Sequence, residues 1–252
     1  MGKKIVGYIK TINSFSENNE YDSYETIGFD IEKVKMGDYV KGTGKFCPAL
    51  KTTFKNLYMI RSPFDLHLKH HFQNNGYSWI EVMNDSSMKG EAFDKIMSVN
   101  NLDDRNDIEH PLIQLNFPTV VISDDDIEMQ MLPALTHYSE LPGLTVGGVI
   151  NIRKWHRTLN WIFEWHDTDK HIKIKRGDPL IFLKFTSKDR DDIIEVRKIN
   201  NTEDINKSVR ICQNMKSIVK ITSDEMDLHL KSRKKYLIKS HIRIILEKLH
   251  LV

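Results

Sequence analysis

The segment from Pro142 to Ile199 is a succession of short runs rich in β-branched, aromatic and aliphatic residues. Charged, polar or glycine-containing stretches separate the runs, as at His166–Asp169 and Arg176–Asp178. The runs span residues 144–152, 157–165, 171–175, 179–185 and 193–199. Short strands spaced in this way are typical of antiparallel sheets, whereas parallel strands need helices between them. The segment therefore predicts a mainly β fold, an antiparallel sandwich or a jelly-roll-like arrangement.

Further strands are predicted in the first half of the chain. Residues 64–69 alternate apolar and polar side chains, as a half-buried strand does, and we expect them to pair with the run 57–61. Pro48 begins a short predicted helix over residues 48–56, because proline is tolerated in a first helical turn. The other predicted strands are 4–10, 77–83, 112–122 and 128–132, with a helical turn in residues 90–98.

The apolar period changes after Asn200. Ile205, Val209 and Cys212 recur at steps of three and four residues, which places them on one face of a helix. The same spacing returns near the end of the chain, at Ile238, Ile242, Ile245 and Leu249. We therefore expect a β-rich domain over residues 1–200 and an amphipathic α-helical C-terminal segment over residues 201–252.

The composition indicates the class of protein. Charged residues make up 29% of the chain and apolar residues 40%, which is ordinary for a protein with a packed core. The longest apolar runs, such as residues 179–183, are far shorter than the roughly 20 residues that span a bilayer. Cys47 and Cys212 are too few and too far apart for a disulfide framework or a four-ligand zinc site. We expect a cytoplasmic protein without a membrane segment, metal or cofactor.

One segment gathers the residue types of acid–base chemistry. His166, Asp167, Asp169 and His171 lie within six positions, and His156 precedes them. Imidazole and carboxylate groups in one place suit proton transfer or metal binding. The same segment lies where a hairpin turn is predicted, and Asp is an ordinary turn residue. The pattern favours a turn, with a catalytic site as the alternative.

Two other clusters also have a functional and a structural interpretation. His67 and His71 have the spacing of two metal ligands on a helix, but their run is predicted to be a strand and no further ligand completes a motif. Trp161, Phe163 and Trp165 share one face of a predicted strand. Such rings form a platform for bases or sugars, or they supply a core. The pattern favours the core.

A basic stretch near the C-terminus is the one sign of nucleic-acid contact. It contains Lys231, Arg233, Lys234 and Lys235, and a local Lys/Arg cluster is the usual electrostatic footprint for phosphates. A solvated helix face carries similar charge, and no nucleic-acid-binding motif accompanies the cluster. Nucleic-acid binding through this stretch is therefore an open alternative.

Three strings resemble uncharacterised bacterial and phage proteins. They are Cys47–Leu50 leading to Arg61–Leu66, then Thr158–Phe163, then Lys175–Leu180. Members of this family share a cysteine–proline opening, an Asn-Trp strand and a Gly-Asp/Glu-Pro turn, and the resemblance covers residues 45–190. It implies a β-rich fold with no assigned activity. The skewed usage of Lys, Asn and Ile also resembles a phage of an AT-rich host.

Two ordered strings are similar to motifs of the trimeric dUTPase family. Val146–Asn151 matches a Gly-Val-Ile-Asp turn of that family, and Lys175–Leu180 matches its Lys-Gly-Asp strand start. Asn151 stands where the family has its catalytic Asp, and an amide cannot act as a carboxylate base. The family's Arg-Ser-Gly phosphate motif is not evident here. This similarity implies a related β architecture that has lost the activity.

No phosphate-binding loop, dinucleotide fingerprint, nucleophile elbow or zinc-protease motif occurs in the sequence. A coherent β pattern without a complete catalytic set predicts a non-enzymatic protein that binds another macromolecule, with a protein as the expected partner, and the resemblance implies that it is phage-encoded. Two alternatives stay open. One is nucleic-acid binding through the C-terminal helix, and the other is a metal-dependent or nucleotide-processing enzyme that uses His156, His166, Asp167, Asp169 and His171.

Overall fold

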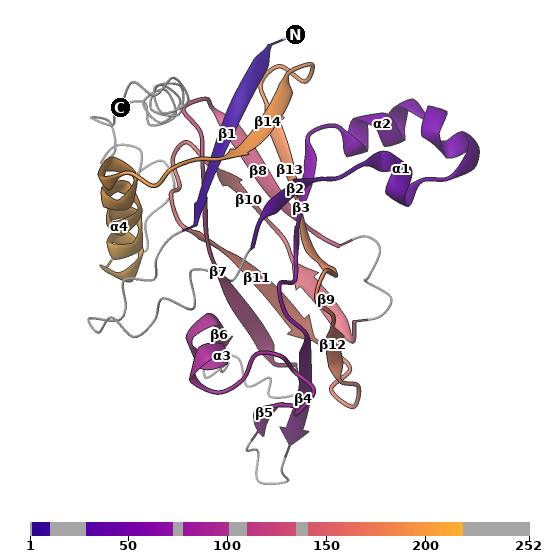
Figure 1. Ribbon diagram of the computed structural model, residues 1–252, viewed down its shortest axis with the longest axis vertical. Coiled ribbons are helices and arrows are strands. Elements are labelled where there is room, and N and C mark those ends of the chain that lie inside the picture. Colours follow the sequence, from indigo (N-terminus) through magenta and orange to yellow (C-terminus); the bar gives the residue numbers. More distant parts are fainter. Residues whose placement is uncertain (1, 11–28, 73–77, 101–109, 135–140, 219–252) are drawn as a thin grey trace, which may run out of the picture.

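The computed structural model describes residues 2–10, 29–72, 78–100, 110–134 and 141–218, and its fold is mainly β. Its strands form three sheets, and the helix of the last described segment packs against one of them (Figure 1). The predicted fold class is thereby confirmed. The second predicted C-terminal helix lies outside the described residues, and the domain boundary at residue 200 stays a prediction. Within the described ranges, no helix combines the length and apolar character that a bilayer span requires.

The first and largest sheet has the strand order β14-β1-β7-β11-β9, and β6 also pairs with β7. Its strands are β1 (Lys3–Lys10), β6 (Met97–Asn100), β7 (Leu112–Ile122), β9 (Gly143–Val146), β11 (Thr158–Trp165) and β14 (Ile193–Lys198). Its pairs are antiparallel except that of β1 with β14. That parallel pair joins the first described strand to the last, so the sheet is completed only by contacts across most of the chain.

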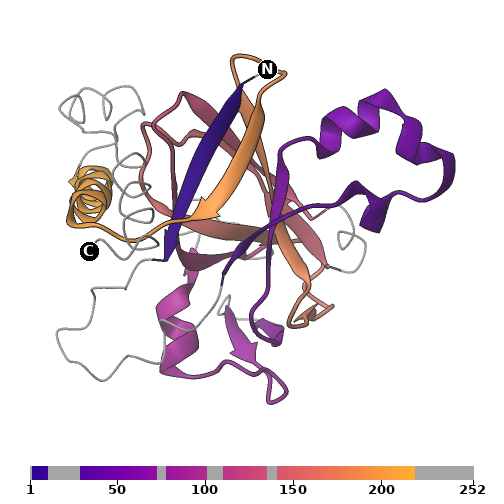
Figure 2. The same ribbon diagram turned by 45° about the horizontal axis from the view of Figure 1, so that its top comes forward.

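The second and third sheets contain the remaining strands. The second has the order β10-β8-β13-β3-β2, and the third has the order β12-β4-β5. Figure 2 shows the strands curling around a shared interior. The strands of the second sheet are β2 (Ile31–Lys33), β3 (Leu57–Arg61), β8 (Ile127–Pro133), β10 (Gly148–Asn151) and β13 (Pro179–Ser187). Those of the third are β4 (Leu66–Phe72), β5 (Ser78–Val82) and β12 (Ile172–Ile174).

The helices lie outside the sheets (Figure 1). They are α1 (Met36–Tyr39), the 3-10 helix η2 (Gly42–Phe46), α2 (Pro48–Phe54), α3 (Glu91–Ile96) and α4 (Glu203–Ile218). Pro48 occupies the first turn of α2, as its fixed φ angle predicts. Ile205 and Val209 of α4 pack with Ile9 and Val120 of the first sheet, so the predicted apolar stripe of this helix meets the sheet.

The tryptophan-rich strand β11 supplies the centre of the core. Trp161, Phe163 and Trp165 are each 0% exposed, which confirms the predicted core role. The rings of Trp161 and Phe163 stack with their centroids 5.2 Å apart. The Trp161 indole N–H donates to the Thr145 hydroxyl (3.2 Å), and that of Trp165 donates to backbone carbonyls in the turn after β11. Both buried indoles thus have the partner that their polar nitrogen requires.

The third sheet continues a ribbon of the second sheet beyond a bend. Residues 62–65 lead from β3 to β4, and residues 175–178 lead from β12 to β13. At this corner the N–H of Ser62 donates to the carbonyl of Asp178, and the N–H of Gly177 donates to the carbonyl of Ser62 (2.8 Å each). Gly177 has a φ of 91°, which a side chain would strain. The two chain segments therefore turn the corner together.

The prediction that the runs 57–61 and 64–69 pair with each other is wrong. β3 pairs with β13 and β2, and β4 pairs with β12 and β5. The backbone N–H and C=O of Ser62 already bind the segment before β13, and the Ser62 hydroxyl donates to the carbonyl of Phe64 (2.6 Å). The chain therefore bends onward beside its neighbour and does not fold back on itself.

The outer edge of β14 is closed by two side chains of the second sheet. Successive residues of a strand direct their backbone groups to opposite edges. The N–H of Ile193 donates to the carbonyl of Gly2, next to β1, so the groups of residues 192, 194 and 196 face away from β1. Asn56, directly before β3, and Tyr58, in β3, reach across from the second sheet. Their side chains provide hydrogen-bond partners for these outward-facing backbone groups.

The hydrogen bonds of this closure are complete on both sides. The Asn56 amide donates to the Asp192 carbonyl (3.0 Å) and accepts from the N–H of Ile194 (2.9 Å). The Tyr58 hydroxyl donates to the Ile194 carbonyl (2.8 Å) and accepts from the N–H of Val196 (3.3 Å). Both side chains belong to buried residues, so their bonds replace a strand pairing in a place that excludes water.

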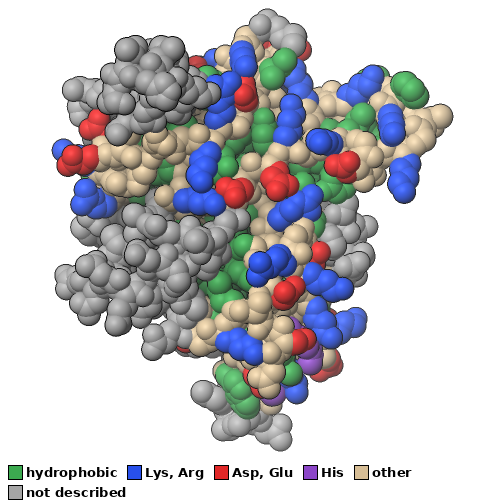
Figure 3. Space-filling model, viewed as in Figure 1, with side chains coloured by type: hydrophobic (Ala, Val, Ile, Leu, Met, Phe, Trp, Pro, Cys, Tyr) green, Lys and Arg blue, Asp and Glu red, His purple; other side chains and the backbone are tan. Residues whose placement is uncertain are grey.

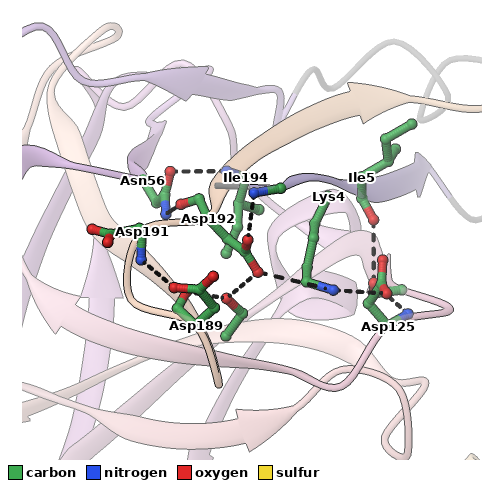
Figure 4. Close-up of polar contacts among 11 residues, drawn as sticks. Lys4, Ile5, Asn56, Asp125, Asp189, Asp191, Asp192 and Ile194 are labelled. Carbon is green, nitrogen blue, oxygen red and sulfur yellow. Dashed lines mark hydrogen bonds and ion pairs between the residues drawn. The ribbon is translucent and has the colours of Figure 1, made fainter.

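The carboxylate of Asp192 extends this network to the start of β1 (Figure 4). It accepts from the N–H of Gly2 (2.9 Å) and from the Ser187 hydroxyl (2.9 Å). Lys4 lies 3.9 Å from Asp192 and 3.1 Å from Asp125, so one ammonium group bridges two carboxylates. The hydrogen bond from Ser187 is the main cause that lowers the pKa of Asp192 below its ordinary value of 3.8.

Replacement of Tyr58 by Phe tests this closure. Tyr58→Phe leaves the buried carbonyl of Ile194 and the half-buried N–H of Val196 without this partner, so we expect the free energy of unfolding to fall by about 1 to 3 kcal/mol. Tyr39→Phe is the matched control, because the Tyr39 hydroxyl lies 3.4 Å from the weak acceptor Sδ of Met59. We expect it to cost below about 0.5 kcal/mol in the same urea titration. Equal losses in the two variants would contradict the closure.

Candidate functional site

The predicted site residues lie in different surroundings, and His156 is the most buried of them. It is 1% exposed, and its Nδ1 lies 2.6 Å from the hydroxyl of Ser208 on α4. The imidazole therefore links the segment before β11 to α4. This contact gives His156 a role in packing α4.

The turn after β11 carries three other predicted residues. Asp167 forms an ion pair with Lys170 (2.7 Å), and Nε2 of His166 lies 3.5 Å from the carboxylate of Glu164. Asp169 is exposed in the turn. These carboxylates and the imidazole lie at the surface, and their contacts are with residues near them in sequence. The turn interpretation accounts for each of these contacts.

His171 is the predicted residue that the structure joins to other groups capable of proton transfer. Its Nδ1 lies 2.7 Å from Nε2 of His67 on β4. Nδ1 of His67 lies 2.7 Å and 2.9 Å from the two carboxylate oxygens of Asp85. The three side chains form a hydrogen-bonded row, which we call the Asp85–His67–His171 chain. A carboxylate that orients an imidazole in this way is a recurring part of acid–base sites.

The Asp85–His67–His171 chain lies at the outer face of the third sheet. We call this face the histidine face. The opposite face of the sheet packs on the core through buried residues such as Leu66, Leu68 and Ile172. Side chains alternate between the two faces of a strand, so the residues between them point outward. Figure 3 shows histidines among charged side chains at this end of the molecule. The histidine face consists of His67, Lys69, His71, Trp79, Glu81, His171 and Lys173.

The strand register explains the contacts on the histidine face. Lys173 lies opposite His67. His171 comes directly before β12 and two residues before Lys173, so its ring reaches His67 diagonally, a geometry within reach of aromatic side chains. Lys69 lies opposite Glu81. The face therefore combines imidazoles and ammonium groups with a carboxylate.

An aromatic stack lies at the far end of the histidine face. His71 and Trp79 are directly opposite on β4 and β5, and their rings are parallel with centroids 4.7 Å apart. Nε2 of His71 lies 2.6 Å from the carboxylate of Glu81. Trp79 is 39% exposed, in contrast to the buried tryptophans of β11. The accessible aromatic surface of this protein therefore includes Trp79, which the sequence pattern did not single out.

The surroundings fix the protonation of the Asp85–His67–His171 chain near neutral pH. The hydrogen bond from His67 is the main cause that lowers the pKa of Asp85. Desolvation is the main cause that lowers the pKa of His171, followed by the charges of His67, Lys69 and Lys173. Asp85 is therefore a carboxylate and His171 a neutral imidazole, which holds a lone pair for a proton.

The described part of the chain contains no group of three His, Cys, Asp or Glu side chains placed to hold a metal ion. In the acidic run before β8, Asp125 binds Lys4 (3.1 Å) and Asp126 accepts from the Asn151 amide (2.6 Å). The Asn151 side chain also accepts from the N–H of Arg153 (3.1 Å). Asn151, which stands at the position of the dUTPase carboxylate, thus holds the turn after β10.

Known proteins were compared with the chain at the level of sequence. No family model matches it. A search of curated proteins also finds no match. The two resemblances drawn from sequence strings therefore stay predictions. Two of those strings, residues 61–66 and 175–180, meet at the corner between the second and third sheets, where their backbone bonds give them a structural role.

A second surface feature is apolar and lies where the chain crosses from the first sheet to the second. β9 ends the first sheet, β10 ends the second, and Gly147 joins them. Within the described residues each of these strands pairs along one edge. Leu144, Val146 and Val149 are 55%, 40% and 62% exposed. We call this surface the β9–β10 edge.

The predicted nucleic-acid contact lies outside the described residues, because these do not include Lys231, Arg233, Lys234 and Lys235. It therefore stays a prediction.

Sequence reasoning missed two contacts of His67. One is with Asp85, 18 positions away, and the other is with His171, 104 positions away. No motif spacing signals contacts of this kind, because strand pairing creates them.

The buried His70 gives a test of how this sheet responds to acid. Within the described part of the chain its Nε2 has no hydrogen-bond partner. Its ring lies 5.9 Å from that of Trp165, and desolvation is the main cause that lowers its pKa. The unfolded chain takes up a proton near the ordinary pKa of 6.5, and the folded chain does so only at lower pH. Stability is therefore lost as pH falls through about 6.5.

We expect His70→Leu to reduce this loss, because leucine has no charged form to desolvate. The measurement is the melting temperature between about pH 8 and pH 5.5, a range that spans the ordinary histidine titration. His166→Gln, at an exposed histidine, is the control and should keep the wild-type slope. A slope in His70→Leu equal to that of the wild type would refute the assignment.

Proposed function

We propose that this chain is a non-enzymatic binding protein that recognises another protein through the β9–β10 edge. The observation that supports the proposal is the exposure of Leu144, Val146 and Val149 on two consecutive strands at sheet ends. Exposed apolar side chains beside an unpaired strand edge accept an added strand from a partner. Backbone hydrogen bonds then supply affinity, and the side chains supply selectivity.

The chemistry of this edge favours a protein over a polyanion. Val146 lies opposite the half-buried Ile162 of β11, so the exposed side chains adjoin further apolar surface. Burial of each aliphatic side chain contributes about 1 to 2 kcal/mol. A phosphate backbone gains nothing from such a surface, whereas an apolar strand of another protein does.

We further propose that the protein is phage-encoded and acts in the host cytoplasm. Cys47 and Cys212 are the only cysteines in the sequence, and so low a cysteine content suits a reducing compartment. The frequent Lys, Asn and Ile residues support a phage of an AT-rich host. The β9–β10 edge would then meet a host or phage protein.

Site-specific photo-crosslinking in cells tests the partner. We expect a photoreactive phenylalanine at position 149 to give an adduct of discrete mass, and the same residue in place of the exposed Thr186 on β13 to give none. Adding Leu144→Lys should reduce the adduct by at least about tenfold, because an ammonium group buried in an apolar contact costs well over 1.4 kcal/mol.

Four outcomes would overturn the proposal. They are an absence of adduct at position 149, an adduct of equal yield at position 186, an adduct whose mass is that of two copies of this chain, and a nuclease-sensitive adduct. Circular dichroism of the Leu144→Lys variant separates loss of binding from loss of fold.

An enzyme is the second candidate, because the Asp85–His67–His171 chain has the geometry of an oriented base. In this candidate His171 accepts the proton of a nucleophile, and His67 and Asp85 are positioning residues that hold its ring. Of the residues predicted for catalysis, His171 carries this role. His156 and Asp167 are engaged in the packing of α4 and in a turn ion pair.

A hydrolysis screen with nucleotides and simple esters tests the second candidate. We expect His171→Gln to lower any turnover by about 10² to 10⁴-fold, the usual contribution of a general base. His166→Gln should leave turnover unchanged. Absence of turnover in the wild-type protein, or equal turnover in His171→Gln, would remove this candidate without affecting the β9–β10 edge.

A further inference from the structure

We infer that the histidine face binds the phosphate group of a small phosphomonoester, and that protonation of the His67–His171 pair switches this binding on. The inference does not depend on the protein partner proposed above, because the β9–β10 edge belongs to other sheets. It rests on the placement of two lysines around a histidine pair that shares one proton. The charge of the face, the shared proton and the shape of the ligand each support it.

Two lysines flank the histidine pair from neighbouring strands. Lys173 lies opposite His67, and Lys69 is the next outward residue after His67 on β4. Lys69 and Lys173 are both close enough to act on the charge of His171. Four nitrogen-bearing side chains from β4 and the start of β12 thus surround one place on the surface. Such a group of cationic donors is suited to a tetrahedral dianion.

Two carboxylates balance these lysines when the histidines are neutral. Asp85 binds His67 from the segment after β5, and Glu81 on β5 faces Lys69 and binds His71. The charged and titratable groups of this face are therefore His67, Lys69, His71, Glu81, Asp85, His171 and Lys173. Two ammonium groups and two carboxylates leave no net charge near pH 7, so an anion gains little there.

The contact of 2.7 Å between Nε2 of His67 and Nδ1 of His171 has room for one proton. In the neutral pair one nitrogen donates and the other accepts. One proton added to the pair still leaves a single N–H in this contact, so it turns the outer nitrogen of His171 from an acceptor into a donor. A second added proton places N–H groups on both facing nitrogens, so the contact opens and the His171 ring is released.

Each of these two protonation steps strengthens the binding of an anion. The first provides a new N–H donor and one positive charge, and the second adds a full imidazolium beside Lys69 and Lys173. His171 is part of the exposed side of the sheet, so a ligand reaches it without unfolding. Affinity for a dianion should therefore rise as pH falls through the range in which histidines titrate.

The surrounding carboxylates decide the kind of phosphate. Asp85 binds His67 and Glu81 lies opposite Lys69, so a phosphate backbone laid across the sheet would place further anionic groups against these carboxylates. A single compact dianion avoids this repulsion. The face therefore suits one phosphomonoester group better than a nucleic-acid strand.

Sulfate is the first probe, because it has the shape of phosphate and a fixed charge over this pH range. We expect the dissociation constant, measured by NMR titration of the full chain at constant ionic strength, to be at least about tenfold lower near pH 5.5 than near pH 7.5. The double variant His67→Gln/His171→Gln should reduce that pH dependence to below about twofold, and Lys173→Ala should weaken binding at both pH values. His166→Gln is the control and should keep the wild-type behaviour.

The second probes are ribose 5-phosphate and a short oligothymidylate. Binding of ribose 5-phosphate with the same pH dependence supports the inference. Tighter binding of the oligothymidylate overturns it in favour of a nucleic-acid strand. Equal sulfate affinity at the two pH values, or a pH dependence that persists in His67→Gln/His171→Gln while its spectrum remains that of the folded protein, also overturns it. None of these results bears on crosslinking at position 149.

Discussion

The fold depends on how the outer edge of β14 finds hydrogen-bond partners in a place that excludes water. Asn56 and Tyr58 supply them from the second sheet, and Asp192 extends the same network to the first residues of β1. The closure joins the two ends of the β region, since β1 and β14 pair in parallel. A buried amide or hydroxyl that meets both an N–H and a C=O costs little, whereas an unpaired one costs a large share of a small protein's stability.

A second constraint is the corner where the β3–β13 ribbon becomes the β4–β12 ribbon. The bonds of Ser62 with Gly177 and Asp178 make the two segments bend together, so the third sheet is held at a defined angle to the second. This explains why two sequence strings that look like family signatures lie together. The side chains and backbone of these two strings stabilise the bend, and the bend positions the histidine face.

The two candidate surfaces have different physical character and suit different ligands. The β9–β10 edge presents aliphatic side chains where strands end, which favours association with another polypeptide. The histidine face presents lysines, carboxylates and a hydrogen-bonded imidazole pair, whose charge changes over one or two pH units. A protein that combines them would hold a partner at one surface while the other responds to acidity and to a small anion.

The sequence by itself determined most of the strands, the amphipathic α4 and the aromatic core, because local alternation and periodicity report which face of an element is buried. Trp161 and Trp165 are core residues on that ground, and the structure places them there. The sequence did not predict β2 or β6, and it joined β9 and β10 in one run, residues 144–152. Nor did it determine which strands pair. It predicts that β3 pairs with β4, whereas each of these strands pairs with others. The tertiary structure alone decided that His171 meets His67 and Asp85 while His156 packs against α4, because contacts between strands distant in sequence depend on sheet register and leave no periodic signal in the chain.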